Sequence, residues 1–191
     1  MREIYLDNAS TTKTDERVLK AILPYFTEKY GNASSSHTKG DEAESALNKS
    51  RRIIAKSIKA TDTEIIFTSG GTESNNLALK GLFFHPENKK NHIITTKIEH
   101  KCILNSCKWL ETQGANITYI GVDKEGFVNL EELKKSITSD TLVVSIIHGN
   151  NEIGTIQNLK EIGKICKQHK VYFHTDACQS YTKTKIDVNK Q

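Results

Sequence analysis

The fold is decided by the stretch Phe173-His174-Thr175-Asp176-Ala177-Cys178-Gln179, in which a short apolar strand predicted over residues 171–174 runs directly into an acid. In an α/β protein, ligands collect outside the carboxyl ends of parallel strands, so a carboxylate at this point would face a crevice instead of the core. Such a carboxylate could hold a protonated ring nitrogen, as an acid does for the pyridine ring of pyridoxal phosphate. Asp176 could also cap a helix that begins near Ala177, and the stretch taken alone favours this second interpretation.

Predicted strands and helices alternate along the chain before this stretch. Strands are expected over residues 64–68, 92–96, 116–120 and 141–147, and helices over 41–60, 101–112, 130–137 and 159–169, with one more helix after the turn at 69–76. Another helix, capped by Asp15 and kinked at Pro24, is expected near the amino end. Strands separated by helices, with apolar runs such as residues 142–147, are typical of a parallel sheet covered on both faces. The sequence therefore predicts an α/β fold with a mostly parallel sheet and helices on both faces.

Length and composition limit the class of protein. The 191 residues suffice for one sizeable core, so one domain is expected. The net charge of +4 is spread along the chain without a basic run, which argues against nucleic-acid binding. No apolar stretch is long enough to cross a bilayer and no apolar signal region begins the chain, which predicts a cytoplasmic protein without a membrane partner. The four cysteines show no CxxC pair, so we expect neither a metal site nor a disulfide framework.

A glycine turn, Ser69-Gly70-Gly71-Thr72, follows one predicted strand and opens a helix. Its backbone amides and the hydroxyl groups of Ser69 and Thr72 would suit a phosphate. The turn is neither a GxGxxG nor a P-loop sequence, which argues against a nucleotide. A tight strand-to-helix connection also requires glycine for its geometry, and for an isolated Gly-Gly pair that explanation is the stronger one.

Further polar residues follow other strands at their predicted carboxyl ends. A neutral imidazole at His100 could lie flat on an aromatic ring and carry protons, and the amide of Asn151 could bind a ring hydroxyl group. Gln179 could reach the same ligand. Each of these residues is also ordinary for a surface, a turn or the first turn of a helix. A shared site is favoured because Thr72, His100, Asn151 and Asp176 each follow a different predicted strand, so that one crevice could gather them.

Several motifs occur in order along almost the whole chain. They are Tyr5-Leu6-Asp7-Asn8-Ala9-Ser10-Thr11-Thr12, Gly31-Asn32 with Ser34-Ser35 and His37, Phe67-Thr68-Ser69-Gly70-Gly71-Thr72-Glu73-Ser74-Asn75-Asn76, Glu99-His100-Lys101, His148-Gly149-Asn150-Asn151-Glu152-Ile153-Gly154 and His174-Thr175-Asp176-Ala177-Cys178-Gln179-Ser180. Together they resemble the cysteine desulfurases, the NifS/IscS-like branch of the class V aminotransferase group. The resemblance implies the large domain of a fold-type I pyridoxal-phosphate enzyme.

The resemblance also implies roles for single residues. Gly71 and Thr72 would bind the cofactor phosphate, His100 would stack on the pyridine ring and act in catalysis, Asn151 and Gln179 would contact the hydroxyl side of the ring, and Asp176 would hold its nitrogen. Enzymes of this family take sulfur from L-cysteine with a mobile thiolate and leave L-alanine and an enzyme persulfide. They pass the sulfur to an acceptor or scaffold protein that assembles iron–sulfur clusters or thiolates tRNA.

The sequence departs from the family pattern mainly in ending at Gln191. Smaller departures are the loop residues Ala33, Thr182 and Lys185. In similar proteins the Schiff-base lysine, the sulfur-accepting cysteine and the arginine that binds the substrate carboxylate come later, and no residue of this chain matches them. We therefore expect residues 1–191 to form a single, partial large domain that lacks C-terminal strands and a small domain and is inactive alone. Unpaired sheet edges favour association, either as a homodimer or with a C-terminal half.

Two other interpretations remain open. The chain could be a non-catalytic relic that binds pyridoxal phosphate, or a regulatory partner of a full-length homologue. It could also be part of another class V enzyme such as a selenocysteine lyase, because the cofactor cradle is shared and substrate selection would lie in the later residues.

Overall fold

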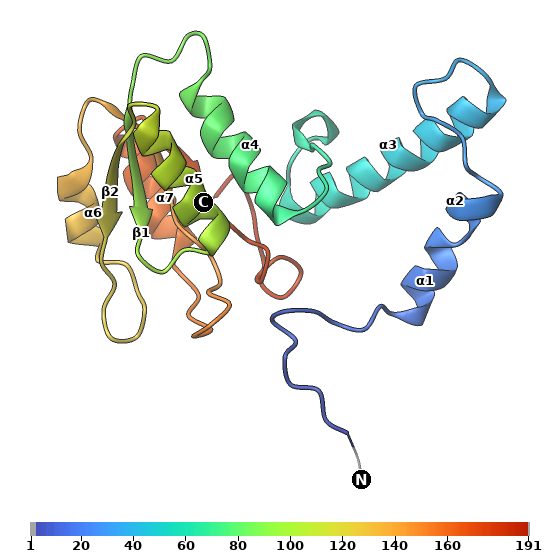
Figure 1. Cartoon of the computed structure of the whole chain (residues 1–191), viewed down its shortest axis with the longest axis horizontal. Helices are drawn as coiled ribbons and strands as arrows, with labels where there is room; N and C mark the ends of the chain where they lie inside the picture. Colours follow the sequence, from blue (N-terminus) through green and yellow to red (C-terminus); the bar gives the residue numbers. More distant parts are fainter. Residues whose placement is uncertain (1–2, 191) are drawn as a thin grey trace. The chain divides into compact units, whose positions relative to one another are not determined.

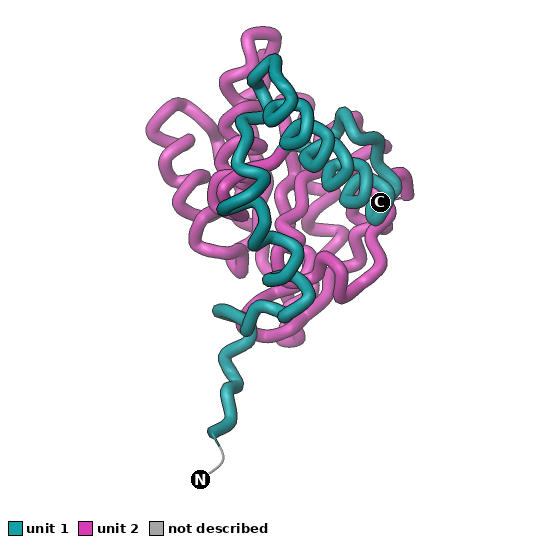
Figure 2. Tube along the Cα trace, turned by 90° about the vertical axis from the view of Figure 1, so that its right-hand side faces the viewer, with its two compact units in different colours: residues 1–66 teal, residues 67–191 magenta. Residues whose placement is uncertain are grey.

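A computed structural model describes residues 3–190, so the two ends of the domain predicted over residues 1–191 lie outside the described residues. The chain divides into two compact units, residues 1–66 and 67–191, which are teal and magenta in Figure 2. None of the helices in the described part of the chain has both the length and the apolar character that a membrane span requires.

The first unit is helical. It contains α1 (Glu16–Ile22), α2 (Pro24–Thr27), α3 (Thr38–Ile58) and the short 3₁₀-helix η1 (Asp62–Glu64). Asp15 caps α1 as predicted, because its carboxylate accepts the Arg17 N–H at 2.8 Å. Proline suits the first position of a helix but not its interior, so the predicted kink at Pro24 is the start of α2. The helix predicted over 41–60 is α3, which begins earlier because His37 Nδ1 accepts the Gly40 N–H.

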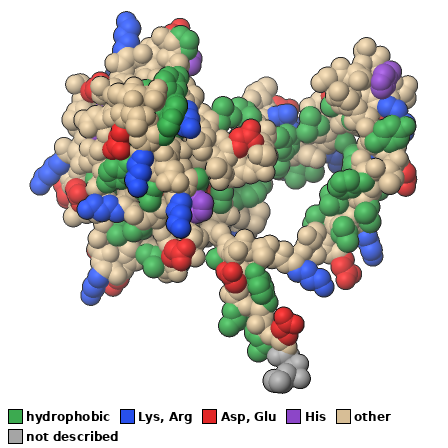
Figure 3. Space-filling view, in the orientation of Figure 1, with side chains coloured by type: hydrophobic (Ala, Val, Ile, Leu, Met, Phe, Trp, Pro, Cys, Tyr) green, Lys and Arg blue, Asp and Glu red, His purple; other side chains and the backbone are tan. Residues whose placement is uncertain are grey.

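Most apolar side chains of this first unit remain exposed. Leu23, Phe26 and Ile53 are 52%, 75% and 61% exposed, whereas Ala55 is buried. Figure 3 shows hydrophobic side chains, in green, along α1–α3. Both buried hydrophobic clusters of the described residues lie in the second unit, so residues 3–66 contribute no cluster of their own.

The strand predicted over residues 64–68 is wrong. Asp62–Glu64 forms η1, and Ile65 is extended with φ −96° and ψ 123° but pairs with no strand among the described residues. A strand exists only where a neighbour supplies the other half of the hydrogen-bond ladder. The run of β-prone side chains therefore agrees with the extended backbone at Ile65 but could not supply a strand partner for it.

The second unit is the predicted α/β fold. It consists of α4 (Gly71–Phe83), β1 (His92–Thr96), α5 (Lys101–Thr112), β2 (Asn116–Ile120), α6 (Leu130–Ser136), β3 (Thr141–Ser145), α7 (Leu159–Gln168) and β4 (Tyr172–His174). All strand pairs are parallel and the sheet order is β2-β1-β3-β4. These bounds match the predicted strands and helices of this region within one or two residues.

Helices cover both faces of this sheet (Figure 1). On one face, Ile93 and Val143 pack with Leu79 of α4 and Leu110 of α5. On the other face, Ile94, Ile120 and Val144 pack with side chains of α6 and α7, among them Leu133 and Ile162. The expected fold class is thereby confirmed.

The strand order places a switch point between β1 and β3. From β1 the chain continues to β2 on one side, and it then crosses back through α6 to β3 on the other side. Loops that leave neighbouring strands in opposite directions open a crevice at the carboxyl edge of a parallel sheet. A ligand site is therefore expected among the residues that follow β1, β3 and β4.

Candidate functional site

Asp176 lies where the sequence predicts it, two residues beyond the end of β4. The residue is only 5% exposed, and its carboxylate is held by two donors: Asn75 Nδ2 at 2.7 Å from Oδ2 and the Cys178 N–H at 2.9 Å from Oδ1. Its carbonyl oxygen accepts the His148 N–H at 2.9 Å, which ties it to the loop after β3. A turn follows at residues 178–180 instead of a helix, so the alternative of a helix cap is wrong.

Asn75 is a site residue that the sequence did not single out. It lies in α4, is 4% exposed, and uses Nδ2 to donate both to Asp176 Oδ2 and to Cys102 Sγ, at 2.7 and 3.1 Å. A mid-helix asparagine is a weak helix former and normally faces water. One signal was available in the sequence, because Asn75 lies one helical turn before the buried Leu79 and therefore on the buried face of α4.

The glycine turn lies against the Asp176 turn. A Cβ atom added to Gly71 would come within 2.5 Å of Cys178 Sγ, so residue 71 must be glycine while Cys178 holds this position. Among the described residues, no side chain caps the first turn of α4 at Gly70, which leaves amide hydrogens there for a ligand. Thr72, predicted to bind the same anion, begins this turn with an exposed side chain.

Ser69 does not offer its hydroxyl group to an anion as expected. The Ser69 N–H and hydroxyl group both donate to Glu73 Oε2, at 2.6 and 2.5 Å. These hydrogen bonds, first from the side chain and then from the backbone, lower the pKa of Glu73. The Glu73 carboxylate thus occupies both hydrogen-bond donors of Ser69.

His100 caps α5 and is connected to Asp176 through other side chains. Its Nδ1 accepts the Cys102 N–H at 3.2 Å and lies 3.0 Å from Cys102 Sγ. Because Asn75 contacts both Cys102 and Asp176, the structure brings His100 and Asp176 into one connected group. The sequence had predicted that these two residues share a rim, but not what joins them.

Asn151 and Gln179 were predicted to contact the same ligand. Asn151 Nδ2 donates to Glu152 Oε1 at 2.8 Å, and Gln179 Oε1 accepts from Lys183 Nζ at 3.4 Å. The neighbouring Asn150 is the buried amide of this loop, and its Nδ2 donates to the Ile98 carbonyl oxygen at 2.8 Å. The ligand contacts of Asn151 and Gln179 stay predictions.

Glu99 joins the carboxyl ends of β1 and β3 at the switch point. Its Oε1 accepts the Thr96 hydroxyl hydrogen at 2.7 Å and the Ile147 N–H at 2.9 Å, whereas Oε2 is buried without a hydrogen-bond partner among the described residues. Burial raises the pKa of Glu99 to about 7, and the nearby charge of Asp176 adds to this effect. This buried acid therefore titrates close to neutral pH.

Two neighbouring histidines are packed residues. Burial lowers the pKa of His174, and its Nδ1 lies 2.9 Å from Ser145 Oγ, as suits a histidine inside a strand. Burial also lowers the pKa of His148. Both side chains are therefore neutral at pH 7, and they add no positive charge beside Asp176.

Three of the four cysteines, Cys107, Cys166 and Cys178, have thiols that are hard to ionise. Cys178 is exposed, but desolvation of its sulfur, followed by the hydrogen bond to Asp176, raises its pKa to about 12. Burial raises the pKa values of Cys107 and Cys166 to about 12 as well. A thiol of this kind is a poor nucleophile at neutral pH.

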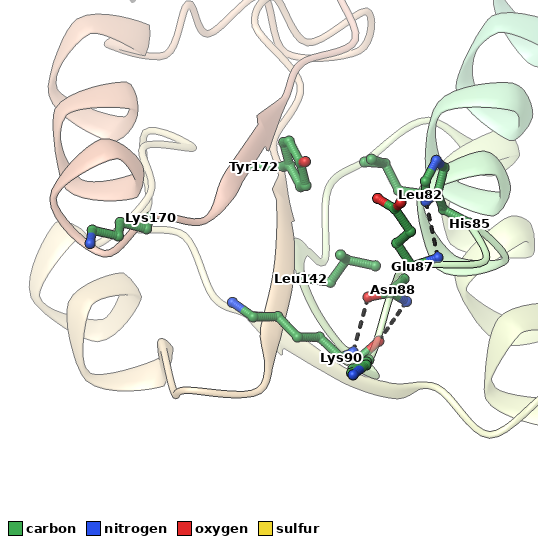
Figure 4. A pocket seen from close by; sticks show the side chains of 9 residues that line it. Leu82, His85, Glu87, Asn88, Lys90, Leu142, Lys170 and Tyr172 are labelled. Carbon is green, nitrogen blue, oxygen red and sulfur yellow. Dashed lines mark hydrogen bonds between the residues drawn. The ribbon is translucent and has the colours of Figure 1, made fainter.

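A cavity of about 470 Å³ lies elsewhere in the second unit (Figure 4). Its lining includes Lys90, Leu142 and Tyr172, which lie within two residues of the starts of β1, β3 and β4. This cavity is therefore at the amino edge of the sheet, opposite the edge that carries Asp176. Ligand sites of parallel sheets lie at the carboxyl edge, so the cavity is not the predicted site.

Known proteins are similar to this chain over almost its whole length. A family model described as aminotransferase class-V matches residues 4–191. The cysteine desulfurase IscS of Ehrlichia chaffeensis is 53% identical over 187 residues, which cover 98% of this chain and 46% of that protein. The mitosomal cysteine desulfurase of Trachipleistophora hominis is 55% identical over 191 residues, 98% of this chain and 43% of that protein.

Solved structures show the same likeness. A NifS-like protein superposes with a TM-score of 0.95 at 41% identity, over 99% of this chain and 52% of that one. SspA in complex with cysteine superposes with a TM-score of 0.94 at 40% identity, over 97% of this chain and 54% of that one. The chain thus spans about half the length of the relatives it matches. With nearly every residue matched by the family model, the chain belongs to the class-V aminotransferase family.

Proposed function

We propose that this chain carries the cofactor cradle of a pyridoxal-phosphate-dependent cysteine desulfurase. The observation that carries the proposal is Asp176, a buried carboxylate at the carboxyl end of a parallel strand, oriented by Asn75 and the Cys178 N–H. A carboxylate in this position is suited to a protonated ring nitrogen. Relatives named cysteine desulfurase match 98% of the chain and support L-cysteine as the substrate.

The described residues fit pyridoxal phosphate on several counts. The start of α4 has amide hydrogens that no side chain caps, and helix N-termini bind phosphate. Gly71 lets the glycine turn lie against Cys178, because an added Cβ atom would come within 2.5 Å of Cys178 Sγ. The His100 side chain is exposed and linked to the Asp176 group. When bound, the cofactor supplies an electron sink for bonds at the substrate α-carbon.

Each residue would then have one task. Asp176 would keep a proton on the pyridine nitrogen, while the amide groups of Gly71 and Thr72 would hold the phosphate. His100 would lie against the ring and exchange protons, and Asn151 and Gln179 would bind its hydroxyl side. These tasks follow from the family resemblance, and the packing of Gly71, His100 and Asp176 around Asn75, Cys102 and Cys178 supports them.

The sulfur would leave on a thiol outside these residues. The carbon–sulfur bond of L-cysteine would break, and the sulfur would join an enzyme thiol as a persulfide. The rest of the substrate would become L-alanine. In total, L-cysteine and one thiol would give L-alanine and one persulfide. Cys107, Cys166 and Cys178 stay protonated at neutral pH because of their raised pKa values. By the family resemblance, the Schiff-base lysine and the sulfur-accepting cysteine match no residue of this chain, so we propose that residues 1–191, as part of one large domain, do not turn over alone.

Partners and location complete the proposal. A cytoplasmic enzyme of this kind would pass sulfur to an acceptor or scaffold protein for iron–sulfur clusters. It would associate with a second copy or with a chain that supplies the C-terminal half of the family fold. The exposed apolar side chains of α1–α3 support association, because monomeric proteins seldom expose many such groups together.

Cofactor binding is tested by titrating the full chain with pyridoxal phosphate and following cofactor absorbance. We expect reversible binding and, after borohydride reduction, no stoichiometric mass adduct. Asp176→Asn should weaken binding about tenfold to a hundredfold, as for loss of a charge-assisted hydrogen bond of about 1.5–3 kcal/mol. Asp140→Asn, at the amino edge of the sheet, is the matched control and should bind normally. Equal binding by both variants, or one specific lysine adduct, would contradict the proposal.

Turnover is tested by adding the C-terminal half of a cysteine desulfurase in trans. We expect alanine release from L-cysteine only when both chains are present. A well-folded complex that releases no alanine would overturn the assignment as a desulfurase while leaving cofactor binding to the titration above.

A further inference from the structure

A chain of hydrogen-bonded side chains runs from Asp176 to His100. Asp176 Oδ2 lies 2.7 Å from Asn75 Nδ2, that nitrogen lies 3.1 Å from Cys102 Sγ, and that sulfur lies 3.0 Å from His100 Nδ1. Asp176, Asn75 and Cys102 are 5%, 4% and 8% exposed. Burial keeps bulk water away from these contacts, so the hydrogens must lie between the named atoms.

The chemistry of the first link sets the direction of this chain. A carboxylate can only accept hydrogen bonds, so Asn75 must turn its NH₂ group toward Asp176. The amide nitrogen has two hydrogens and no acceptor site, so it is also the donor to Cys102 Sγ. The Cys102 sulfur accepts a hydrogen bond from Asn75. Its own S–H hydrogen then remains available to donate to His100 Nδ1.

The backbone supplies a second donor to the same imidazole nitrogen. Cys102 lies in the first turn of α5, and its N–H donates to His100 Nδ1 at 3.2 Å. A nitrogen that accepts hydrogen bonds from both the amide and the thiol of Cys102 cannot carry a hydrogen itself. In a neutral imidazole the hydrogen must then be on the other nitrogen.

We propose that Cys102 is a positioning residue that fixes His100 in the tautomer with its hydrogen on Nε2. The Cys102 amide and thiol occupy Nδ1 together: the amide can only donate, and the direction of the thiol contact is argued from Asp176 and Asn75. The imidazole therefore meets a ligand as a hydrogen-bond donor through Nε2. This last consequence rests on the proposed function: beside a cofactor, the neutral His100 side chain would donate a hydrogen bond to a ligand through Nε2.

The tautomer is measured by histidine ¹⁵N NMR on the full, labelled chain without cofactor. Two-bond couplings between the ring hydrogens and nitrogens distinguish the two neutral tautomers, and the His100 signals among the seven histidines are those lost in His100→Gln. We expect the Nε2–H pattern for His100 in the wild type. A wild-type Nδ1–H pattern would overturn the proposal.

Variants of Cys102 separate its thiol from its backbone amide. Cys102→Ala should shift the His100 nitrogen signals toward the average of both tautomers, whereas Cys102→Ser, which keeps a hydroxyl donor, should retain the wild-type pattern. Cys107→Ala is the matched control, since Cys107 is a buried cysteine of the same helix. Unchanged signals in Cys102→Ala, or an equal shift in Cys107→Ala, would show that the thiol does not set the tautomer.

The two proposals fail separately. If Cys102→Ala does not fold, the wild-type and Cys102→Ser spectra still decide between the tautomers. The NMR measurement contains no cofactor, so a wrong tautomer leaves the binding proposal intact. Conversely, a failed cofactor titration leaves the assignment of the His100 tautomer unchanged.

Discussion

Asn75 donates a hydrogen bond of 2.7 Å to Asp176 across 101 residues of sequence. This contact links α4, which precedes the sheet, to the turn after its last described strand. A buried carboxylate needs donors to offset the loss of water, and Asn75 and the Cys178 N–H are the donors here. The orientation of Asp176 therefore depends on α4 as much as on its own strand.

Asn75→Ala should lower the free energy of unfolding by about 1–3 kcal/mol, because it leaves a buried carboxylate oxygen without its donor. Urea denaturation of the full chain measures the change as a shift of the midpoint at constant slope. Asn151→Ala is the control, since its amide donates to the exposed Glu152, and it should stay within about 0.5 kcal/mol of the wild type. Equal losses in both variants would contradict a special role for Asn75.

Gly71→Ala should destabilise the chain by about 1–3 kcal/mol, because the new Cβ would come within 2.5 Å of Cys178 Sγ. The same substitution at Gly81, also in α4, meets no atom within 4 Å and should stabilise by about 0.5–1 kcal/mol, as alanine is the better helix former.

A double mutant identifies the sulfur as the cause. With Cys178→Ala the sulfur is gone and the nearest remaining atom of that side chain, Cβ, lies 4.0 Å from the added group. Gly71→Ala should then cost nothing, which corresponds to a coupling energy of about 1–3 kcal/mol between the two positions. Additive effects in thermal or urea unfolding would mean that the glycine is needed for another reason.

The sequence predicted what depends on local pattern. Strands β1 and β2 and helix α5 were predicted residue for residue, because their hydrophobic periodicity and caps are local signals. The position of Asp176 was predicted for the same reason. Residues 64–68 were wrong because pairing depends on a neighbouring strand, which a local pattern cannot specify.

Asn75 and Glu99 were not singled out because their partners are distant in sequence. Their contacts to Asp176 and Ile147 span 101 and 48 residues. A polar residue on a buried helix face and a glutamate between a strand and a helix each have ordinary local explanations. Only the fold shows that both stabilise the carboxyl edge of the sheet.

Cys178 should react slowly with iodoacetamide at neutral pH although the residue is exposed. Desolvation, followed by the contact with Asp176, raises the pKa of its thiol to about 12, so the reactive thiolate is scarce. Its labelling should be on the order of a hundredfold slower than that of a free cysteine and should accelerate as pH rises. Peptide mapping by mass spectrometry measures the rate.

Asp176→Asn should speed the labelling of Cys178, whereas the control Asp140→Asn should leave the rate unchanged. Labelling of wild-type Cys178 at the rate of a free cysteine would refute this account.

Glu99→Gln should make the chain less sensitive to pH. The pKa of Glu99 is raised by burial from 4.5 to about 7, so between these values the folded chain keeps a proton that the unfolded chain releases. The free energy of unfolding then falls as pH rises, because the folded state binds more protons. The contribution of protonated Glu99 is complete below about pH 4.5 and is lost as pH rises through about 7, with a total on the order of 3 kcal/mol.

The difference in unfolding free energy between wild type and Glu99→Gln isolates the contribution of this acid from that of other titrating groups. Glutamine keeps the acceptor for Thr96 and Ile147, and its uncharged amide replaces the carboxylate oxygen that has no partner among the described residues. The variant should therefore be close to the wild type at pH 4.5 and the more stable of the two at pH 8, in urea unfolding at a series of pH values.

Glu87→Gln, an exposed glutamate of the same unit, should show a constant difference from the wild type across this range. A difference for Glu99→Gln that does not change with pH would mean that Glu99 is charged throughout, and its buried oxygen would then need a donor that the described residues do not supply.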